Sequence, residues 1–243
     1  MERFINELAS LQVESMLDIA TGTGHFIKTI EKYVPNKLVY TGIDINSEVL
    51  DRAAEEIKNY TNLESRVKLI NADFTAGCFN QNEFDLVSIS NSLHHFRSLN
   101  DCFSEIRRVL KNEGRFIINE MISDENQSIQ ELNHVKLHHW YANLDRSKGC
   151  YHRETYRKNE LEDLVRSNLG NEFTSEIYSP GLDVVNMKSF TDRIIDSMNQ
   201  TIAKLDKKKN SLEIETGIMI RQEIEENGIT FPKSIFILGK KCG

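Results

Sequence analysis

Apolar and polar positions follow two alternating patterns in the first half of the chain. Short apolar runs typical of buried strands lie at residues 16–20, 38–45, 67–70, 84–90 and 115–121. Segments with the 3.6-residue repeat of a helix lie between several of them, at 25–33, 47–60 and 101–110. This alternation predicts an α/β fold with a parallel, doubly wound sheet.

The second half of the chain has a different rhythm. Residues 123–149 are polar and rich in histidine and aromatic side chains. Beyond them the pattern predicts a helix at 157–168, a sixth strand at 172–179, a long helical stretch at 184–227 and a last strand at 234–240. We expect residues 1–243 to form one domain, with 184–228 as a helical insertion between strands six and seven, where only a short connection is needed.

The insertion carries an apolar face and a basic run. Ile194, Ile195, Met198, Ile202 and Leu205 repeat at helical spacing, so this face is buried against the core, a lid or another copy of the chain, which leaves a homodimer open. Lys207 to Lys209 are expected in a turn between two helices. We predict that the insertion and residues 123–152 cover the substrate; the alternative for 123–152 is a surface helix that packs its aromatic residues inward.

Composition narrows the classes of partner. With 30 basic and 37 acidic residues the formal net charge is −7, which disfavours nucleic acid as a partner. No apolar run approaches the roughly 20 residues of a membrane span, and the N-terminus lacks an apolar signal region, so we expect a cytoplasmic protein. The four cysteines, Cys78, Cys102, Cys150 and Cys242, form no CxxC pair and indicate neither a zinc knuckle nor a disulfide framework.

Glycines and acidic residues follow the first three strands. Gly22 and Gly24, in the loop after the first strand, let the backbone turn tightly and lie close to a ligand. Asp44, at the end of the second strand, is placed to accept hydrogen bonds from ribose hydroxyls. Asp73, at the end of the third, could hold an adenine amino group while the ring packs on Phe74. A nucleotide-like ligand is therefore expected at this edge of the sheet.

Together these motifs resemble the class I S-adenosylmethionine-dependent methyltransferases, in particular the small-molecule branch near the ubiquinone and menaquinone C-methyltransferases. The resemblance covers about residues 15–122, through LDIATGTGHF, GIDIN, NADF, FDLVSISNSLHHF and LNDCFSEIRRVLKNEGRFII. It implies a Rossmann-like sheet of seven strands in the order 3-2-1-4-5-7-6, with the last strand reversed, and S-adenosyl-L-methionine as cofactor. NAD is disfavoured because its fingerprint needs a glycine where this chain has Ile27.

The resemblance also implies which residues bind the cofactor. By position, the loop from Asp18 to Gly24, including Ala20, Thr21 and Gly22, would contact the methionine portion, Asp44 the ribose, Ile45, Asp73 and Phe74 the adenine, and Ser90 and Asn91 would lie beside the sulfonium. Two departures from the family pattern stand out. Ala20 replaces the first motif glycine, and Asn112-Glu113-Gly114 replaces Pro-Gly-Gly after the fourth helix.

Two groups of residues are candidates for the chemistry. Methyl transfer is an in-line displacement that needs alignment and sometimes a base. His94 and His95 follow the fourth strand next to the expected methyl group; we expect one of them to be structural and take His95 as the candidate base. Within 123–152, His139 and Tyr141 are candidates to reach the nucleophile from a lid.

A metal site is considered and not predicted. His134 and His138 lie four residues apart and share one face of a helix, but no suitably spaced third ligand is apparent, and a metal is unusual in this branch. The sequence thus predicts methyl transfer from S-adenosylmethionine to a small molecule. The alternatives are a tRNA or protein methyltransferase that uses Lys207 to Lys209 as a contact, and a non-catalytic cofactor-binding regulatory subunit.

Overall fold

The apolar runs of the sequence form one seven-stranded sheet. This computed structural model describes residues 2–34, 38–60, 63–124, 126–180 and 184–241. The strands are β1 (Ser15–Ile19), β2 (Val39–Asp44), β3 (Val67–Asn71), β4 (Phe84–Ser90), β5 (Leu110–Met121), β6 (Phe173–Tyr178) and β7 (Ser234–Lys240). Their order is β3-β2-β1-β4-β5-β7-β6, and β7 runs antiparallel to both of its neighbours. The predicted fold class and strand order are confirmed.

Helices cover both faces of this sheet because successive strand residues point to opposite sides. In β1, Met16 packs toward one face while Leu17 and Ile19 pack toward the other. The first face is covered by α1 (Glu2–Ser10), α2 (His25–Glu31) and α3 (Ser47–Lys58), and the second by α4 (Leu99–Val109) and α6 (Lys158–Leu169). Short 3₁₀ turns are η1 (Glu64–Arg66), η2 (Phe74–Ala76) and η3 (Leu93–His95).

A first helix, α1, precedes the predicted elements and was not foreseen. Its residues Phe4 and Leu8 are buried on the sheet, and the Phe4 ring meets Phe236 of β7 edge to face at a centroid distance of 4.6 Å. The strand β5 also begins earlier than expected, at Leu110, because its pairing with β4 continues across an irregularity before Arg115. Both features extend the core without changing its topology.

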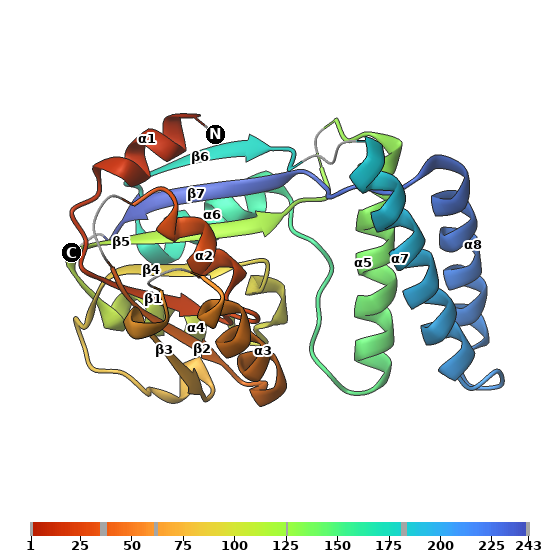
Figure 1. Cartoon of the computed structure of the whole chain (residues 1–243), viewed down its shortest axis with the longest axis horizontal. Helices are drawn as coiled ribbons and strands as arrows, with labels where there is room; N and C mark the ends of the chain where they lie inside the picture. Colours follow the sequence, from red (N-terminus) through yellow and green to blue (C-terminus); the bar gives the residue numbers. More distant parts are fainter. Residues whose placement is uncertain (1, 35–37, 61–62, 125, 181–183, 242–243) are drawn as a thin grey trace.

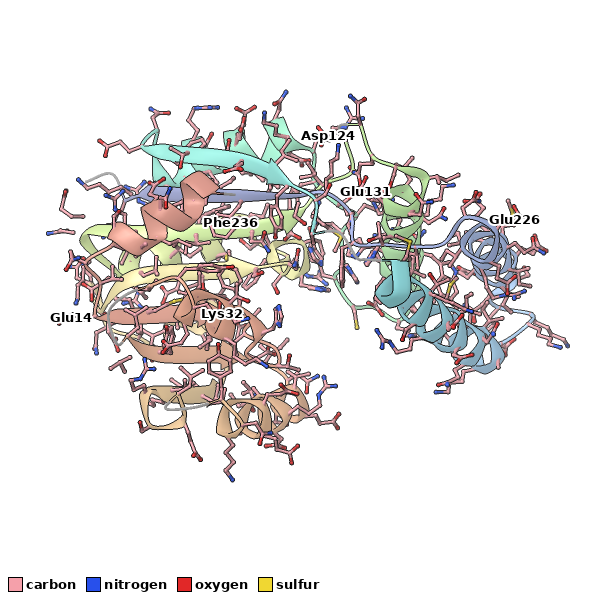
Figure 2. All side chains as sticks on the ribbon, turned by 45° about the horizontal axis from the view of Figure 1, so that its top comes forward. Glu14, Lys32, Asp124, Glu131, Glu226 and Phe236 are labelled. Carbon is pink, nitrogen blue, oxygen red and sulfur yellow. The ribbon has the colours of Figure 1, made fainter. Side chains whose placement is uncertain are left out.

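Three further helices stand together beyond the carboxyl ends of the strands (Figure 1). They are α5 (Ile129–Ser147), α7 (Val184–Lys204) and α8 (Ser211–Asn227), and we call them the helical unit. In Figure 2 the unit extends away from the sheet, with Glu131 at the junction and Glu226 farther out. Its own apolar core comprises Leu137, Trp140, Leu144, Met198, Ile220, Ile224 and Ile229.

The predicted helical insertion forms α7 and α8, and Lys207 to Lys209 lie in the turn between them. The apolar face containing Ile194 and Ile202 packs against the core of the helical unit. Within the described ranges, none of the helices combines the length and the apolar character that a membrane crossing requires. Cys78, Cys102 and Cys150 are free thiols, and Cys242 lies outside the described residues.

Candidate active site

A left-handed backbone shapes the loop between β1 and α2. Ala20, Gly22 and Gly24 have φ values of 51°, 54° and 72°. The loop is tied to β2, because the Thr21 amide donates to the Ile43 carbonyl at 3.0 Å and the Gly22 amide donates to Asp44 Oδ2 at 3.0 Å. Ala20 therefore adopts the left-handed backbone conformation that glycine adopts readily. For a residue with a side chain this conformation costs about 1–2 kcal/mol.

Asp18 supports this loop from inside the sheet. It is 1% exposed; Thr21 Oγ1 donates to its Oδ2 at 2.7 Å, and Ser88 Oγ donates to its Oδ1. Burial raises the pKa of Asp18 to about 6. Neither Asp18 nor Thr21 nor Gly24 lines the cavity beside the loop, and the hydrogen bonds of Asp18 hold the loop backbone from inside the sheet.

That cavity, which we call the loop cavity, has a volume of about 760 Å³. It lies at the carboxyl ends of β1, β2 and β3 and is closed by the turn after β4. The predicted residues Ala20, Gly22, Asp44, Ile45, Asp73, Phe74 and His95 all line it. The structure thus brings together, from four separate segments, most of the residues that the resemblance implied.

The chemistry of the loop cavity fits a nucleoside. Ile45 is 76% exposed at the cavity although it is apolar, and Phe74 is 2% exposed, so an aromatic base would find two apolar contacts. The backbone amides of Gly22 and Asn46 hold the two oxygens of Asp44 at 3.0 and 2.9 Å, which fixes the carboxylate for ribose hydroxyls. The amide and the hydroxyl of Thr75 both donate hydrogen bonds to Asp73 Oδ1. Oδ2 of Asp73 is left to accept a hydrogen bond from an amino group.

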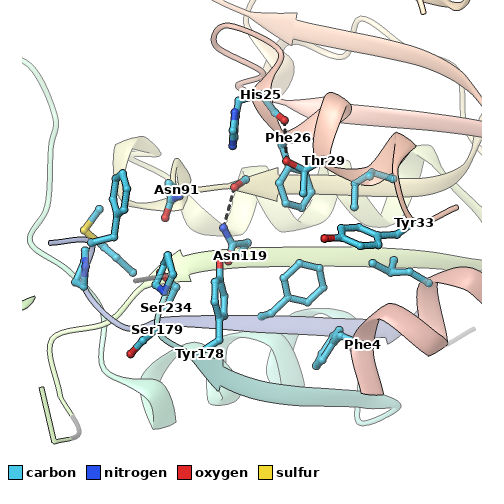
Figure 3. A pocket seen from close by; sticks show the side chains of 18 of the residues that line it. Phe4, His25, Phe26, Thr29, Tyr33, Asn91, Asn119, Tyr178, Ser179 and Ser234 are labelled. Carbon is cyan, nitrogen blue, oxygen red and sulfur yellow. Dashed lines mark hydrogen bonds between the residues drawn. The ribbon is translucent and has the colours of Figure 1, made fainter. Parts of the chain in front are cut away.

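A second cavity of about 700 Å³, the apolar cavity, lies between α1, α2, the carboxyl ends of β5 and β6 and the amino end of the antiparallel β7 (Figure 3). Its apolar walls come from Phe4, Leu8, Phe26, Ile30, Met121, Phe231 and Phe236. Ser90 and Asn91, expected beside the sulfonium, line this cavity and not the loop cavity. The size is within the range of about 300–1,000 Å³ that is usual for small-molecule sites.

A chain of hydrogen bonds crosses one wall of the apolar cavity. The Tyr178 hydroxyl donates to Asn119 Oδ1 at 2.8 Å, and Asn119 Nδ2 donates to Ser90 Oγ at 2.9 Å (Figure 3). Burial raises the pKa of Tyr178, so its hydroxyl stays protonated. Asn91, next to Ser90, has a φ of 47° and donates its amide to the Asn119 carbonyl at 2.8 Å. Hydrogen bonds thus hold the polar groups of this wall in place.

The two cavities adjoin at two short segments. Gly22 lines the loop cavity and His25 lines the apolar cavity within the same loop. Likewise Asn91 lines the apolar cavity while Ser92, the next residue, lines the loop cavity. A ligand that extends from one cavity toward the other therefore passes between the glycine loop and the turn after β4.

Helix α5 places one histidine at the apolar cavity. His134 Nδ1 lies 3.0 Å from the Thr230 carbonyl oxygen, to which it donates, so Nε2 is the acceptor nitrogen of the ring. Phe190 and Phe231 lie against the imidazole at centroid distances of 6.0 and 5.8 Å. Burial lowers the pKa of His134 and keeps the ring neutral at pH 7. His134 can therefore accept a proton at the cavity.

Of the catalytic candidates that the sequence indicates, His95 is the one that lines a cavity. His95 lines the loop cavity, and burial together with the nearby His94 and His152 lowers its pKa to about 3. His94 is the structural member of the pair, since its Nδ1 lies 3.0 Å from Glu120 Oε1 in the buried core.

The other two candidates are not brought to either cavity. His139 Nε2 lies 2.8 Å from Thr155 Oγ1, and the Tyr141 hydroxyl lies 3.3 Å from Ser197 Oγ of α7. Their hydrogen bonds connect α5 to a loop and to its neighbouring helix. We therefore assign them a structural role.

Sequence reasoning missed His25, Asn119 and Tyr178. Asn119 had a signal, because it is a polar residue that directly follows the apolar run Phe116 to Ile118 of β5. Tyr178 had only its position at the end of a strand. His134 was noted as a metal candidate, and only the tertiary structure shows that it faces Thr230 and the apolar cavity.

Comparison with known proteins agrees with this geometry. Residues 12–176 match the family model described as a methyltransferase domain, and the chain belongs to that family. A demethylmenaquinone methyltransferase from Bacteroides fragilis is 28% identical over 129 residues, which are 53% of this chain and 51% of the relative. One from Thermotoga maritima is 28% identical over 121 residues, 50% of this chain and 49% of the relative. The chain thus spans about half the length of these curated relatives.

Solved structures share the fold over the whole chain. YcgJ from Bacillus subtilis has a TM-score of 0.60 at 18% identity and covers 100% of this chain and 97% of its own. Phosphoethanolamine N-methyltransferase 2 of Haemonchus contortus, solved with S-adenosyl-L-methionine, has a TM-score of 0.57 at 16% identity and covers 100% of this chain and 52% of its own. Family membership confirms the expected methyltransferase class. The expected cofactor, S-adenosyl-L-methionine, agrees with this family and with the ligand of the Haemonchus contortus structure.

Proposed function

We propose that the protein methylates a small, largely apolar acceptor that carries a ring hydroxyl, with S-adenosyl-L-methionine as donor. The observation that carries this proposal is the apolar cavity, whose aromatic and aliphatic walls surround a few fixed polar groups and adjoin the loop cavity. The similarity to demethylmenaquinone methyltransferases supports an acceptor of the reduced quinone type.

The residues of the two cavities would divide the work. Asp44, Asp73 and the apolar pair Ile45 and Phe74 would hold the cofactor, which supplies an electrophilic methyl group when bound. The walls of the apolar cavity would align the acceptor and exclude water, which alone supplies much of the catalysis of a displacement.

Polar groups would then act on the acceptor hydroxyls. The Ser90 hydroxyl, which accepts from Asn119, is free to donate to an acceptor oxygen. His134 Nε2 would accept a hydroxyl proton, so that the electron pair left on the acceptor can attack the methyl group. In this arrangement α5 would supply the base. Of the substrate cover that the sequence predicts, only His134 of α5 lines a cavity among the described residues.

The macromolecular alternative receives no support from the basic run. The turn with Lys207 to Lys209 joins α7 to α8 at the far end of the helical unit in Figure 1, away from the strands. None of these lysines lines either cavity. The apolar cavity itself favours a catalytic protein over a regulatory subunit that binds the cofactor alone.

The test is methyl transfer from labelled S-adenosyl-L-methionine to reduced demethylmenaquinone and to a panel of hydroxylated aromatic compounds. Extraction into organic solvent and mass spectrometry identify the product. Three variants accompany the wild type: His134→Gln, Tyr178→Phe, and His139→Gln as a control on the same helix that lines neither cavity. Cofactor affinity is measured for each by calorimetry.

We expect His134→Gln to lower kcat by about 10²-fold or more with cofactor affinity unchanged, because a general base contributes that much. Tyr178→Phe removes a hydrogen bond from the chain that orients Ser90, and should lower kcat/KM by up to about tenfold. His139→Gln should behave as the wild type. Absence of any product from wild-type protein that binds the cofactor, or equal loss in all three variants, would refute the proposal.

A further inference from the structure

Four imidazoles meet where α5 approaches the sheet. The histidine cluster consists of His94 and His95 in η3, His138 in α5 and His152 in the loop after α5. Five of their ring pairs have centroids 4.2 to 5.3 Å apart. Residues separated by up to 58 positions in the sequence thus form one compact group of nitrogen donors.

Carboxylates orient two of these rings from behind. Glu120 Oε1 lies 3.0 Å from His94 Nδ1, and Asp145 Oδ2 lies 2.8 Å from His152 Nδ1. A carboxylate on one ring nitrogen leaves the other nitrogen, Nε2, as the atom for coordination. Glu120 is also fixed, because its Oε2 accepts from the Leu93 amide at 3.0 Å and the side chain is fully buried.

Two nitrogens of the histidine cluster lack a partner. Nε2 of His138 and Nε2 of His152 are buried and have no hydrogen bond from any part of the chain that the structure describes. Buried polar atoms without partners are rare in native proteins and point to a bound group that satisfies them. The two atoms belong to rings 4.9 Å apart, so one group can satisfy both.

We propose that the histidine cluster binds one divalent transition-metal ion of the zinc type. One nitrogen each of His94, His95 and His152 lies within 4.8 Å of the others, and small rotations would bring them to the spacing of about 3.3 Å in a tetrahedral zinc site. His138 lies beside them as a fourth donor. An all-imidazole set favours zinc, cobalt, nickel or copper over magnesium or calcium, which prefer oxygen.

The proposed site differs from the pair considered in the sequence. His134 is directed to Thr230 and the apolar cavity, whereas His138, one turn later, meets His94 and His152. The missing ligands come from the turn after β4 and from the loop after α5, and no spacing rule could have joined them. The ion would tie both of these segments to α5.

The position of the site also links it to the cofactor. His95 belongs to the histidine cluster and at the same time lines the loop cavity. A bound ion would therefore fix one wall of the loop cavity and hold α5 against the carboxyl end of β4. Its role would be to order the site.

The experiment titrates the purified protein, freed of metal by a chelator, with Zn²⁺ by calorimetry and with Co²⁺ by visible absorption. His152→Asn keeps an amide nitrogen for Asp145 while it removes Nε2, and His138→Phe keeps a ring while it removes both nitrogens. Asp145→Asn weakens only the orienting bond. The matched control is His134→Gln, an imidazole of the same helix outside the histidine cluster. Circular dichroism confirms that each variant is folded.

We expect one equivalent of Zn²⁺, a higher Tm with Zn²⁺ than with the chelator, and Co²⁺ absorption typical of tetrahedral nitrogen ligands. Asp145→Asn should weaken binding by about 10–100-fold, as loss of such a carboxylate does, and His152→Asn by at least as much. His134→Gln should bind as the wild type. Failure of the folded wild type to bind an equivalent of Zn²⁺, unchanged affinity in His152→Asn, or loss of binding in His134→Gln would overturn the proposal.

Discussion

Ala20 and Glu113 show how single residues carry strain in this chain. Both stand where the resembling family has glycine, and both have a left-handed backbone, with φ values of 51° and 67°. At both positions a residue with a side chain thus adopts a backbone conformation that glycine adopts more readily. Ala20 lines the loop cavity, whereas Glu113 lies in the irregular first part of β5 and lines neither the loop cavity nor the apolar cavity.

Glu113→Gly should raise the free energy of unfolding by about 0.5–1 kcal/mol. Glycine avoids the cost of about 1–2 kcal/mol that a residue with a side chain has in the left-handed conformation. Part of this gain is offset, because glycine also increases the conformational entropy of the unfolded chain. The lost ion pair with Lys240 is exposed and contributes little. Urea denaturation of Glu113→Gly and of Glu113→Ala, which keeps the strain, measures the effect. Equal stability of the two variants would contradict it.

Asp18 should make stability depend on pH in a particular window. Its pKa is about 6 in the folded protein and 3.8 when unperturbed, so between these values the unfolded chain releases a proton that the folded chain keeps. The stabilisation is fully present below pH 3.8 and is lost as the pH rises to about 6.

Relative to Asp18→Asn, which cannot ionise, the wild type should lose up to about 3 kcal/mol of unfolding free energy between pH 4 and pH 7. Urea denaturation of both proteins at the two pH values isolates this group from all others that titrate. Parallel changes in the two proteins would show that Asp18 does not carry the shift.

At the scale of elements, the contact between α5 and α8 depends on a residue that has no side chain. Gly217 of α8 faces the buried ring of Trp140, and a Cβ at this position would lie 2.6 Å from Trp140 Cζ2. The ring cannot easily retreat, because its Nε1 donates to the Glu213 carbonyl at 2.7 Å. The missing side chain thus sets how closely the two helices approach.

Gly217→Ala should therefore lower stability by about 1–3 kcal/mol through overpacking, although alanine is the better helix former by about 1 kcal/mol. Turnover should fall, because α5 carries His134, while cofactor affinity stays the same. Glu215→Ala on the exposed face of α8 is the control. Thermal unfolding and calorimetry give both quantities, and a variant more stable than the wild type would contradict the packing argument.

Elements with strong local signals were predictable. The strands β4 and β7 have the predicted bounds because they are short, mostly apolar runs bounded by polar residues or turns. The helix α1 was missed, since its burial depends on a contact between Phe4 and Phe236 at opposite ends of the chain. Contacts between distant segments were not predictable for Tyr141 either. A helical position for Tyr141 could be expected from the sequence, but its contact with Ser197 of α7 could not.

At the scale of the whole molecule, the two cavities differ in how far the sequence could predict them. Asp44 ends β2 and Asp73 follows β3, its parallel neighbour, so topology alone brings them to one edge of the sheet. The apolar cavity combines Phe4 with Phe231 and Phe236, and the histidine cluster combines η3 with α5. Such sites arise from packing between distant segments, which periodicity and spacing do not record.

The measurement that tests the central claim is calorimetric titration of S-adenosyl-L-methionine into the wild type, Asp44→Asn and the control Asp51→Asn, an exposed acid of α3 outside the loop cavity. We predict saturable one-to-one binding that is at least about tenfold weaker in Asp44→Asn, since one charged hydrogen bond contributes about 1.5–3 kcal/mol, and unchanged in Asp51→Asn. NAD should not bind. Equal affinity in all three folded proteins, or no binding by the wild type, would contradict the assignment of the loop cavity.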